Sequence, residues 1–439
     1  MKVFNPFGLD LFGLVLFLVE NVPYIVLGII VLLIFPSFSP KDPKSAVADR
    51  RKLALIFVPA LIVTISFSVF ACSWEDAYSR GYQIFSQSSL RSALESYIET
   101  GNGDLNDILE SGKFAPTFGY YELRYLAKDL LRHTLFHTND HNEENIDEGY
   151  NKGNDWFNSF LGETMMYTSG LYPTGNETLE EAQNYKIDYV ANALQLQPGH
   201  TVLDIGCGWT YLAKRLAEKH SAKVTGITLS KEQLKWGTEW RKPTDDTKFF
   251  LQDAMKIKER DDLPKDGFDR ITSLEMAEHV GIRRYQEFLS VVKSLLKDDG
   301  VFYFQVAGLR RHWRFEDLAW GLFMGEHIFP GADASCPLGW VSDQLERAGF
   351  EIQRVHNMGS HYSRTLADWL VNWRSKEAYI IAKYGAESYR RWEVFLAWSV
   401  RVARQGSSTV FMFALTKADV MDERRISSQS HLVPKDIGA

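Results

Sequence analysis

Residues 201–209 read Thr-Val-Leu-Asp-Ile-Gly-Cys-Gly-Trp, and this stretch decides the fold. A short apolar run carries Asp204 near its end and is followed by Gly206 and Gly208, with an amphipathic helix predicted from Tyr211. Glycines let a backbone pass close beneath a bound nucleoside, and an acid at this point can order the amino or ribose end of the ligand. A dinucleotide fingerprint would need a third glycine where Tyr211 stands. The bland alternative is a glycine-rich strand-to-helix turn without function.

The chain around this turn alternates short apolar strands with amphipathic helices. Alternating β and α elements predict a mainly parallel sheet with helices on both faces, and ligands then bind at the carboxyl ends of the strands. The predicted strands are Thr201–Ile205, Lys223–Thr228, Lys248–Leu251, Asp269–Ser273, Val301–Val306, Glu351–Asn357 and Ser408–Leu415. The predicted helices are Tyr211–His220, Ser230–Trp240, Arg284–Leu296, Leu338–Ala348 and Leu366–Ala403.

The Asp-x-Gly-x-Gly spacing resembles the first motif of the class I S-adenosylmethionine-dependent methyltransferases, which implies a Rossmann-like α/β fold. Two further stretches fall where that fold places cofactor contacts. After the second strand, Thr228 and Gln233 carry side chains that can hydrogen-bond hydroxyls, although many relatives have an acid here. After the third strand, Asp253 and Ala254 stand where an acid commonly accepts from the adenine amino group; read alone, Asp253 is equally a loop acid.

Two apolar blocks dominate the first seventy residues. The block at 9–35 is interrupted by Glu20, Asn21 and Pro23, whereas the block at 53–72 contains no charged residue. A helix of about 20 apolar residues spans the hydrocarbon core of a bilayer. We therefore expect residues 1–72 to be a membrane anchor, followed by a helical N-terminal extension at 73–160. A methyltransferase domain is predicted at 161–418, with a lid insertion at about 309–337, and a polar tail at 419–439.

The orientation of this anchor has two competing readings. The linker at 37–52 carries five basic residues, which the positive-inside rule places in the cytosol. If both blocks crossed fully, the rest of the chain would lie on the far side of the membrane, whereas the catalytic chemistry favours a cytosolic body. A re-entrant or interfacial first block would reconcile the two. We expect an integral membrane protein of the endoplasmic reticulum with a cytosolic catalytic domain.

Composition excludes several classes of protein. The chain has 49 basic and 56 acidic residues, a net charge of −7, whereas a nucleic-acid binder needs a basic face to displace counterions. Its three cysteines, Cys72, Cys207 and Cys336, are odd in number and far apart, which excludes a disulfide scaffold and any CxxC site.

Several motifs as a set resemble the cyclopropane fatty acid and mycolic acid synthases, over about residues 145–418. They are Met166-Tyr167-Thr168-Ser169-Gly170, Asp204-Ile205-Gly206-Cys207-Gly208-Trp209, Thr228-Leu229-Ser230-Lys231-Glu232-Gln233, Glu278-His279-Val280-Gly281 and Ile328-Phe329-Pro330. The added N-terminal blocks are similar instead to the fungal sphingolipid C9-methyltransferases, which methylate the Δ8 double bond of a ceramide base. The resemblance implies S-adenosylmethionine as cofactor and a membrane lipid, ceramide or glucosylceramide, as substrate. It further implies cofactor contacts by Tyr150, Tyr167 and Thr168.

Methyl transfer to an alkene leaves a carbocation, so the enzyme must exclude water, stabilise the cation and remove one proton. Loss of a proton from the new methyl group closes a cyclopropane; loss from the carbon that accepted the methyl restores the double bond. In the family this base is thought to be a bicarbonate ion in a small polar cluster. The resemblance places Glu278 and Tyr362 in that cluster as candidate catalytic residues. Ser169 and Gln305, the other two candidates, stand where bacterial members carry other residues. Whether this chain uses bicarbonate as its base is therefore open.

Other functions remain as alternatives. Within the class, these are a cyclopropane-forming synthase on phospholipid acyl chains and a lipid N-methyltransferase. From another class, His133, His137 and His141 at helical spacing favour a membrane metal-dependent desaturase, although the His-x-x-His-His clusters of such enzymes are absent from this sequence. A non-catalytic membrane adaptor is disfavoured because Asp204 and the glycines are intact.

Overall fold

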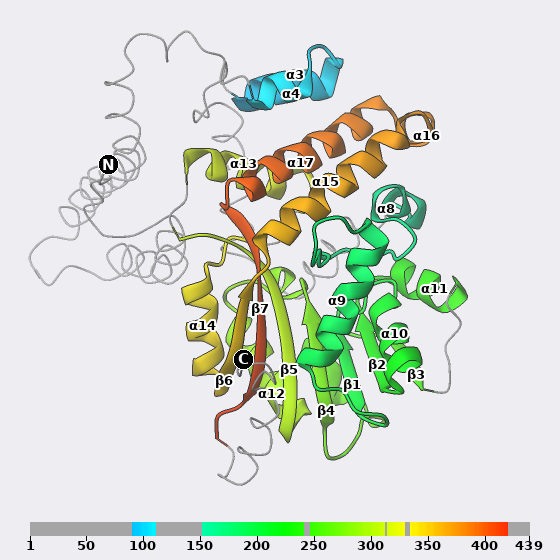
Figure 1. The fold of residues 1–439 in the computed structure, drawn as a ribbon, viewed down its shortest axis with the longest axis vertical. Helices are drawn as coiled ribbons and strands as arrows, with labels where there is room; N and C mark the ends of the chain where they lie inside the picture. The colour runs from blue at the N-terminus through cyan, green and yellow to red at the C-terminus, as the bar shows by residue number, and fades with distance from the viewer. Residues whose placement is uncertain (1–89, 111–151, 241–245, 312–313, 330–333, 420–439) are drawn as a thin grey trace, which may run out of the picture. The chain divides into compact units, whose positions relative to one another are not determined.

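The computed structural model describes residues 90–110, 152–240, 246–311, 314–329 and 334–419 (Figure 1). Both predicted membrane segments, 9–35 and 53–72, lie outside these residues, as do the polar tail from 420 and much of the helical extension. Among the residues described, no helix is long and apolar enough to cross a bilayer.

A sheet of seven strands forms the centre of the described part, in the order β3-β2-β1-β4-β5-β7-β6. Neighbours from β3 to β5 run parallel, and β7 runs antiparallel to both β5 and β6. The strands are β1 Thr201–Ile205, β2 Lys223–Thr228, β3 Thr247–Leu251, β4 Phe268–Leu274, β5 Leu296–Leu309, β6 Phe350–Asn357 and β7 Ser408–Lys417. The predicted mainly parallel α/β sheet is confirmed. Strand β5 begins where a helix was expected to end, at Leu296.

Helices pack against the strands of this sheet (Figure 1). Helices α9 (Leu179–Ala193) and α10 (Tyr211–His220) pack together, and α10 and α11 (Lys231–Trp240) contact β2 and β3. Helix α14 (Leu338–Arg347) contacts β6 and packs against α12 (Tyr285–Leu295), which contacts β5. Short 3-10 turns, η3 (Ala254–Glu259) and η4 (Ala277–His279), follow β3 and β4. The turns that leave β1 to β4 therefore meet at one edge of the sheet.

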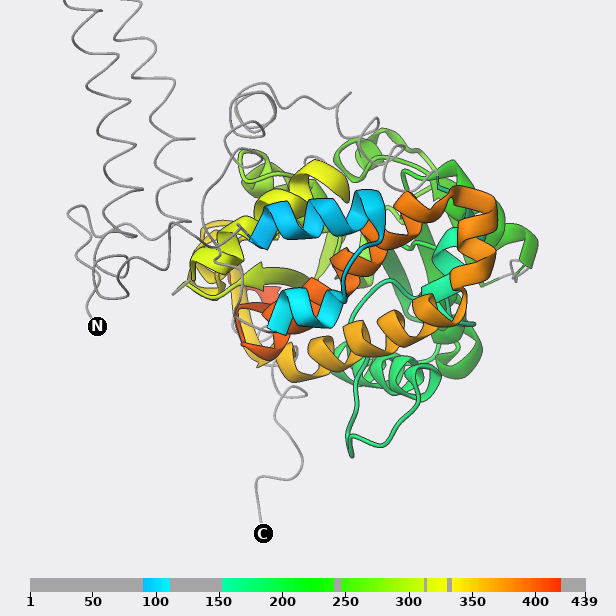
Figure 2. The same cartoon turned by 90° about the horizontal axis from the view of Figure 1, so that it is seen from above.

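A helical layer covers this edge, as Figures 1 and 2 show. Its helices are α3 Leu90–Thr100, α4 Leu105–Glu110, α8 Asn154–Leu161, α13 Phe315–His327, α15 Gly359–Ser375, α16 Glu377–Tyr384 and α17 Ala386–Arg404. The prediction of one long helix at Leu366–Ala403 is wrong. The chain leaves helical geometry at Lys376 (φ −106°) and again at Gly385 (φ +88°). A glycine with a positive φ commonly ends a helix. Helix α13 lies inside the predicted lid insertion.

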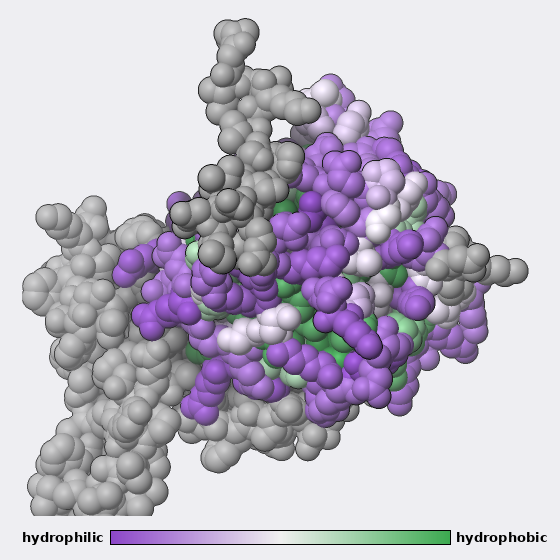
Figure 3. All heavy atoms as spheres, turned by 90° about the horizontal axis from the view of Figure 1, so that it is seen from below, coloured by the Kyte–Doolittle hydropathy of each residue, from purple (hydrophilic) through white to green (hydrophobic). Residues whose placement is uncertain are grey.

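Aromatic side chains fill the interior of this helical layer. Trp156 of α8 packs edge-on against Trp373 of α15 and Trp392 of α17, with ring centroids 4.8 and 5.5 Å apart. All three rings are fully buried. Burial of such large rings is the main force that holds α8, α15 and α17 together. The surface differs from this apolar interior. The face in Figure 3 is mostly hydrophilic, with a few apolar residues among the hydrophilic ones.

Candidate active site

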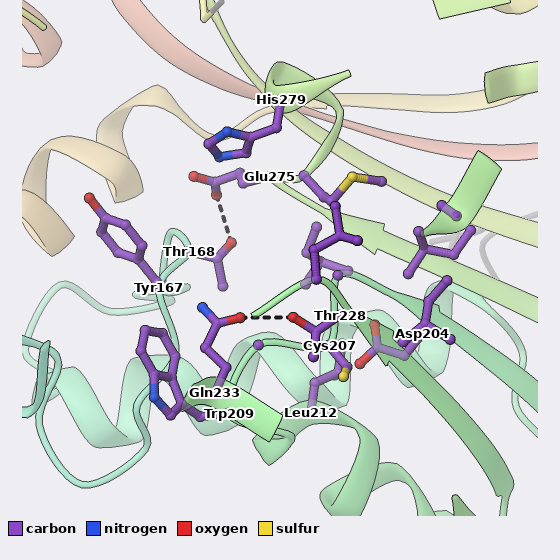
Figure 4. Close-up of a pocket in the computed structure, with 18 of the residues that line it drawn as sticks. Tyr167, Thr168, Asp204, Cys207, Trp209, Leu212, Thr228, Gln233, Glu275 and His279 are labelled. Atoms are coloured by element: carbon purple, nitrogen blue, oxygen red, sulfur yellow. Dashed lines mark hydrogen bonds between the residues drawn. The ribbon is translucent and has the colours of Figure 1, made fainter. Parts of the chain in front are cut away.

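A cavity of about 160 Å³ opens where β1, β2, β3 and β4 end (Figure 4). Ten of the side chains or glycines predicted to bind the cofactor line this one cavity: Tyr167, Thr168, Asp204, Gly206, Cys207, Gly208, Thr228, Gln233, Asp253 and Ala254. They come from four separate stretches of sequence, at 167–168, 204–208, 228–233 and 253–254. The eleventh, Tyr150, lies outside the described residues. The cavity is thus where an alternating α/β fold binds ligands.

Asp204 is the acid of the glycine-rich turn and is 2% exposed. Its Oδ1 accepts a hydrogen bond from the Thr272 hydroxyl at 2.8 Å, and no described residue bonds its buried Oδ2. Burial raises the pKa of this carboxyl to about 6, against the smaller lowering effect of the Thr272 hydrogen bond. A buried acceptor without a partner destabilises the protein unless a ligand donates to it. Asp204 therefore fits a cofactor that presents a hydrogen-bond donor.

Gly206 follows Asp204 in left-handed backbone, with φ +79°. A Cβ at this position would lie 2.7 Å from Cγ of Met276, which is closer than real Cβ contacts come. The amides of Gly206 and Cys207 both donate to the carbonyl of Ile227 at 2.9 Å, which ties the turn to β2. The absent side chain leaves a backbone cradle beside the cavity, as a closely bound nucleoside requires.

Thr228 and Gln233 bond to each other at the end of β2. The Thr228 hydroxyl donates to Gln233 Oε1 at 2.9 Å, and the amide of Ser230 donates to the same hydroxyl. The Ser230 hydroxyl also accepts from the backbone amide of Gln233, which caps the start of α11. This arrangement leaves the Gln233 amide group as a donor on the cavity wall.

Asp253 begins η3. Its Oδ1 accepts from the amide of Met255 at 2.8 Å, so this carboxylate caps its own turn while it lines the cavity. The structural and the ligand-binding interpretations of Asp253 are therefore compatible.

Glu275, which the sequence did not single out, lies at the opposite end of the cavity. Its Oε1 accepts three hydrogen bonds: from the Thr168 hydroxyl at 2.6 Å, the Ser169 amide at 3.0 Å and the Gln305 side chain at 2.7 Å. Its backbone is left-handed, with φ +48°. Thr168, Ser169 and Gln305 were predicted to contact cofactor or anion, and here all three hold one carboxylate.

Lys186 supports this group from α9 and is fully buried. Its Nζ donates to the Thr168 hydroxyl and to the Ser169 carbonyl, both at 2.7 Å. Burial lowers the pKa of Lys186 to about 7, whereas the charge of Glu275 raises it. Lys186 is thus a positioning residue for the loop that holds Glu275.

Glu278 and Tyr362 lie beside this group and are not among the residues that line the cavity. Glu278 lies in η4, and its Oε1 accepts from the backbone amide of Ala307. Burial raises the pKa of Tyr362, and the charges of Glu275 and Glu278 raise it further. The structure therefore brings the four predicted catalytic residues together around Glu275, and their catalytic roles stay predictions.

Aromatic rings close the cavity beside Glu275. Tyr167 packs against Trp369 at 5.2 Å and Phe329 at 5.9 Å, and Phe329 also meets the His279 ring edge-on at 6.2 Å. Burial lowers the pKa of His279 to about 4, so its ring is neutral at physiological pH. Phe329 belongs to the predicted lid insertion, which thereby reaches the edge of the site.

Sequence reasoning missed Glu275, and a signal for it was present. Glu275 directly follows β4. Thr228 at the end of β2 and Asp253 just after β3 were recognised as candidates because of the same kind of position. Lys186 had a weaker signal, since a single lysine in α9 is ordinarily a surface residue.

His133, His137 and His141 of the metal-site alternative lie outside the described residues. Within the described ranges, no group of three or more metal-ligating side chains is close enough to hold an ion.

Comparison with known proteins places this site in a family. Residues 137–413 match the family model described as mycolic acid cyclopropane synthetase. Sphingolipid C9-methyltransferase 2 of Gibberella zeae is 47% identical over 273 residues, which are 61% of this chain and 52% of that protein. The Candida albicans sphingolipid C9-methyltransferase is 41% identical over 337 residues, 74% of this chain and 64% of that one. The chain thus spans about half to two thirds of the length of these relatives.

Among solved structures, the cyclopropane synthase MmaA2 from Mycobacterium tuberculosis matches with a TM-score of 0.59 and 29% identity, over 63% of this chain and 98% of that one. The mycolic acid cyclopropane synthase CmaA1 complexed with SAH and CTAB matches with a TM-score of 0.58 and 30% identity, over the same shares of the two chains. The predicted class I methyltransferase fold is confirmed by these neighbours.

Proposed function

The chain belongs to the mycolic acid cyclopropane synthetase family, and we propose that it transfers a methyl group from S-adenosylmethionine to an alkene carbon of a membrane lipid. The acceptor we propose is C9 of the Δ8-unsaturated long-chain base of ceramide or glucosylceramide. Relatives named sphingolipid C9-methyltransferases, 41–47% identical to this chain, support that choice. The observation that carries the proposal is one cavity that joins a glycine-rich turn suited to a nucleoside, the half-buried carboxylate of Glu275 and aromatic rings.

The residues of this cavity fit the cofactor. Asp204 has a buried oxygen without a partner among the described residues, and Gly206 leaves a cradle that a Cβ would fill. Asp204 would hold the donor groups at one end, Thr228 and Gln233 the ribose hydroxyls, and Asp253 the adenine amino group. When bound, S-adenosylmethionine supplies an electrophilic methyl group.

The other end of the cavity suits a lipid cation. Tyr167 and the neutral ring of His279 present aromatic faces, and Phe329 packs against both. Such rings exclude water and stabilise positive charge without reacting with it. Exclusion of water matters because a carbocation that meets water becomes an alcohol instead of an alkene.

Lipid mass spectrometry of cells with and without the protein tests this function. We expect a gain of about 14 Da per methyl group, confined to the ceramide base, because each transferred methyl replaces one hydrogen. A branched alkene would support loss of the proton from the methylated carbon, whereas a ring would identify the cyclopropane-forming alternative. A change confined to phospholipid acyl chains would refute the sphingolipid proposal.

The predicted membrane location is a separate proposal, in which the anchor at 1–72 holds a cytosolic catalytic domain at the endoplasmic reticulum. Asn176, in the sequence Asn-Glu-Thr, is exposed just before α9 and would be open to glycosylation in the lumen. Treatment with a glycosidase should leave the mobility of the protein on a gel unchanged. A shift that disappears in Asn176→Gln would place the domain in the lumen.

A further inference from the structure

The residues around Glu275 hold a carboxylate of the protein, where members of the family are thought to hold a bicarbonate ion. Ser169 and Gln305 stand at positions of the family's bicarbonate cluster where bacterial members carry other residues, and their side chains could still hydrogen-bond an anion. In the structure, the Ser169 amide and the Gln305 side chain both donate to Glu275 Oε1. The Thr168 hydroxyl donates its one proton to the same oxygen of Glu275. Its own oxygen accepts hydrogen bonds from Lys186 and Gln305. These donors are engaged and do not fit an added anion.

We propose that the carboxylate of Glu275 is the built-in base of this enzyme, which removes the proton that follows methyl transfer. The inference rests on the proposed function and names a catalytic residue for it. It replaces the bicarbonate ion with a side chain of the protein.

The two oxygens of Glu275 are held differently, and this asymmetry suits a base. Three donors fix Oε1, whereas Oε2 makes no hydrogen bond to the residues that the structure describes. Figure 4 shows the carboxylate between Thr168 and His279 on the side of Tyr167, and Glu275 lines the cavity. A fixed carboxylate with one open oxygen can accept a proton without first breaking a contact.

The charge of Glu275 also suits the cation that must be stabilised. Lys186 bonds the same loop, but the Thr168 hydroxyl and the Ser169 carbonyl accept its protons, and Glu275 does not. Lys186 therefore lies near the carboxylate of Glu275 without forming a direct hydrogen-bonded ion pair with it. Such a preorganised carboxylate lowers the energy of a positive charge that develops on the lipid.

Backbone strain is a third, independent observation. Glu275 has φ +48°, a region that residues with a Cβ occupy at a penalty of about 1 kcal/mol or more. Its amide donates to the Gln305 carbonyl at 2.8 Å, which holds the strained turn in place. Strained backbone that surrounding hydrogen bonds hold in place is found preferentially at functional sites. This supports a chemical role for the Glu275 side chain.

After methyl transfer, the lipid carries a cation on the carbon next to the methylated carbon. Glu275 Oε2 takes the proton from the methylated carbon, the electron pair of that C–H bond restores the double bond, and the carboxylate becomes a neutral acid. The acid then returns the proton to water after product release.

The test uses the full-length chain in vesicles that contain Δ8-unsaturated ceramide, with binding of S-adenosylhomocysteine measured in parallel. In Glu275→Gln we expect turnover to fall by about 100- to 10,000-fold with binding changed by less than about threefold, because only the base is lost. With substrate deuterated at C9, the residual rate should show a larger isotope effect than the wild type. Glu218→Gln, an exposed glutamate on α10, is the matched control and should retain the full rate.

Glu275→Gly sharpens the test because glycine adopts φ +48° without strain and leaves the donors in place. We expect an inactive protein that binds S-adenosylhomocysteine and regains activity with added formate, whereas the wild type gains nothing from formate or bicarbonate. Failure of formate to restore activity in a variant that binds the cofactor product would overturn the proposal. So would a wild-type rate that falls when bicarbonate is removed, or a large loss in Glu278→Gln without one in Glu275→Gln. If the wild type methylates no sphingolipid, the proposed function fails instead.

Discussion

The two ends of the cavity are built in different ways. Asp204, Thr228 and Asp253 each lie at or just after the end of a parallel strand, so the cofactor end is assembled from consecutive β–α turns. The end around Glu275 draws on a loop, a helix and two strands that lie far apart in sequence, and its members bond mainly to one another. The first end leaves polar groups open for a ligand, whereas the second uses them to hold one carboxylate. Variants at the first end should therefore change binding, and variants at the second should change turnover.

Gly206 offers the largest expected effect because it touches both ends. In Gly206→Ala the new Cβ would press on Met276, the residue next to Glu275. We expect S-adenosylhomocysteine binding to weaken by about 1000-fold and turnover to be lost, because the close backbone approach is blocked. Calorimetric titration measures the binding. Gly199→Ala is the matched control, since Gly199 has φ +84° and its Cβ would meet nothing within 4 Å. Equal losses in the two variants would show that backbone strain, and not the cradle, is responsible.

Asp204→Asn separates binding from stability at the cofactor end. We expect binding of S-adenosylhomocysteine at pH 7 to weaken by about 100-fold, because a hydrogen bond to a charged group contributes about 1.5–3 kcal/mol. The ligand-free variant should unfold at the same temperature as the wild type or a higher one. Its asparagine removes a buried carboxylate whose pKa is raised to about 6.

The sign of the pH dependence follows from that shift. Between pH 3.8 and about 6 the unfolded carboxyl is ionised and the folded one is protonated, so Asp204 lowers stability as pH rises through this window. Binding by the wild type should weaken as pH falls below about 6, and the variant should lack this dependence. A pH-independent wild-type affinity between pH 5 and 7 would contradict a role for the Asp204 carboxylate.

Lys186→Met tests the other end. We expect turnover to fall by about tenfold while binding of the cofactor product stays within about twofold, because the loop at Thr168 and Ser169 loses two hydrogen bonds of about 1 kcal/mol each. Stability should not fall in proportion, since the substitution also removes a costly buried amine. Steady-state kinetics with titration calorimetry separate the two effects. Lys219→Met, at an exposed lysine of α10, is the control. A loss of cofactor binding in Lys186→Met would contradict the assignment of binding to one end of the cavity and turnover to the other.

The difference between the two ends of the cavity also explains which features the sequence could predict. The seven strands, and the residues predicted to bind the cofactor that line one cavity, could be found from the sequence. Each follows a local rule, an apolar run that ends in glycine or a polar side chain. Glu275 does follow a strand, but its role, like that of Lys186, depends on contacts with Thr168. That residue is more than 100 positions from Glu275 and 18 from Lys186 in the chain. The break of the helix predicted at 366–403 was missed for the opposite reason. A long apolar periodicity continued through Lys376 and Gly385, where the backbone leaves helical geometry.

Gln233→Ala has the smallest expected effect and tests whether the cofactor end is truly modular. The Gln233 amide is open to the cavity, and its carbonyl oxygen accepts from Thr228. The alanine variant loses one neutral hydrogen bond to the ligand, so we expect binding to weaken by about threefold with turnover unchanged at saturating cofactor. Lys231→Ala, an exposed position on the same helix, controls for helix propensity. If Gln233→Ala lowered turnover as well, the turn after β2 would be coupled to Glu275, and the division of the cavity into a binding end and a reaction end would be wrong.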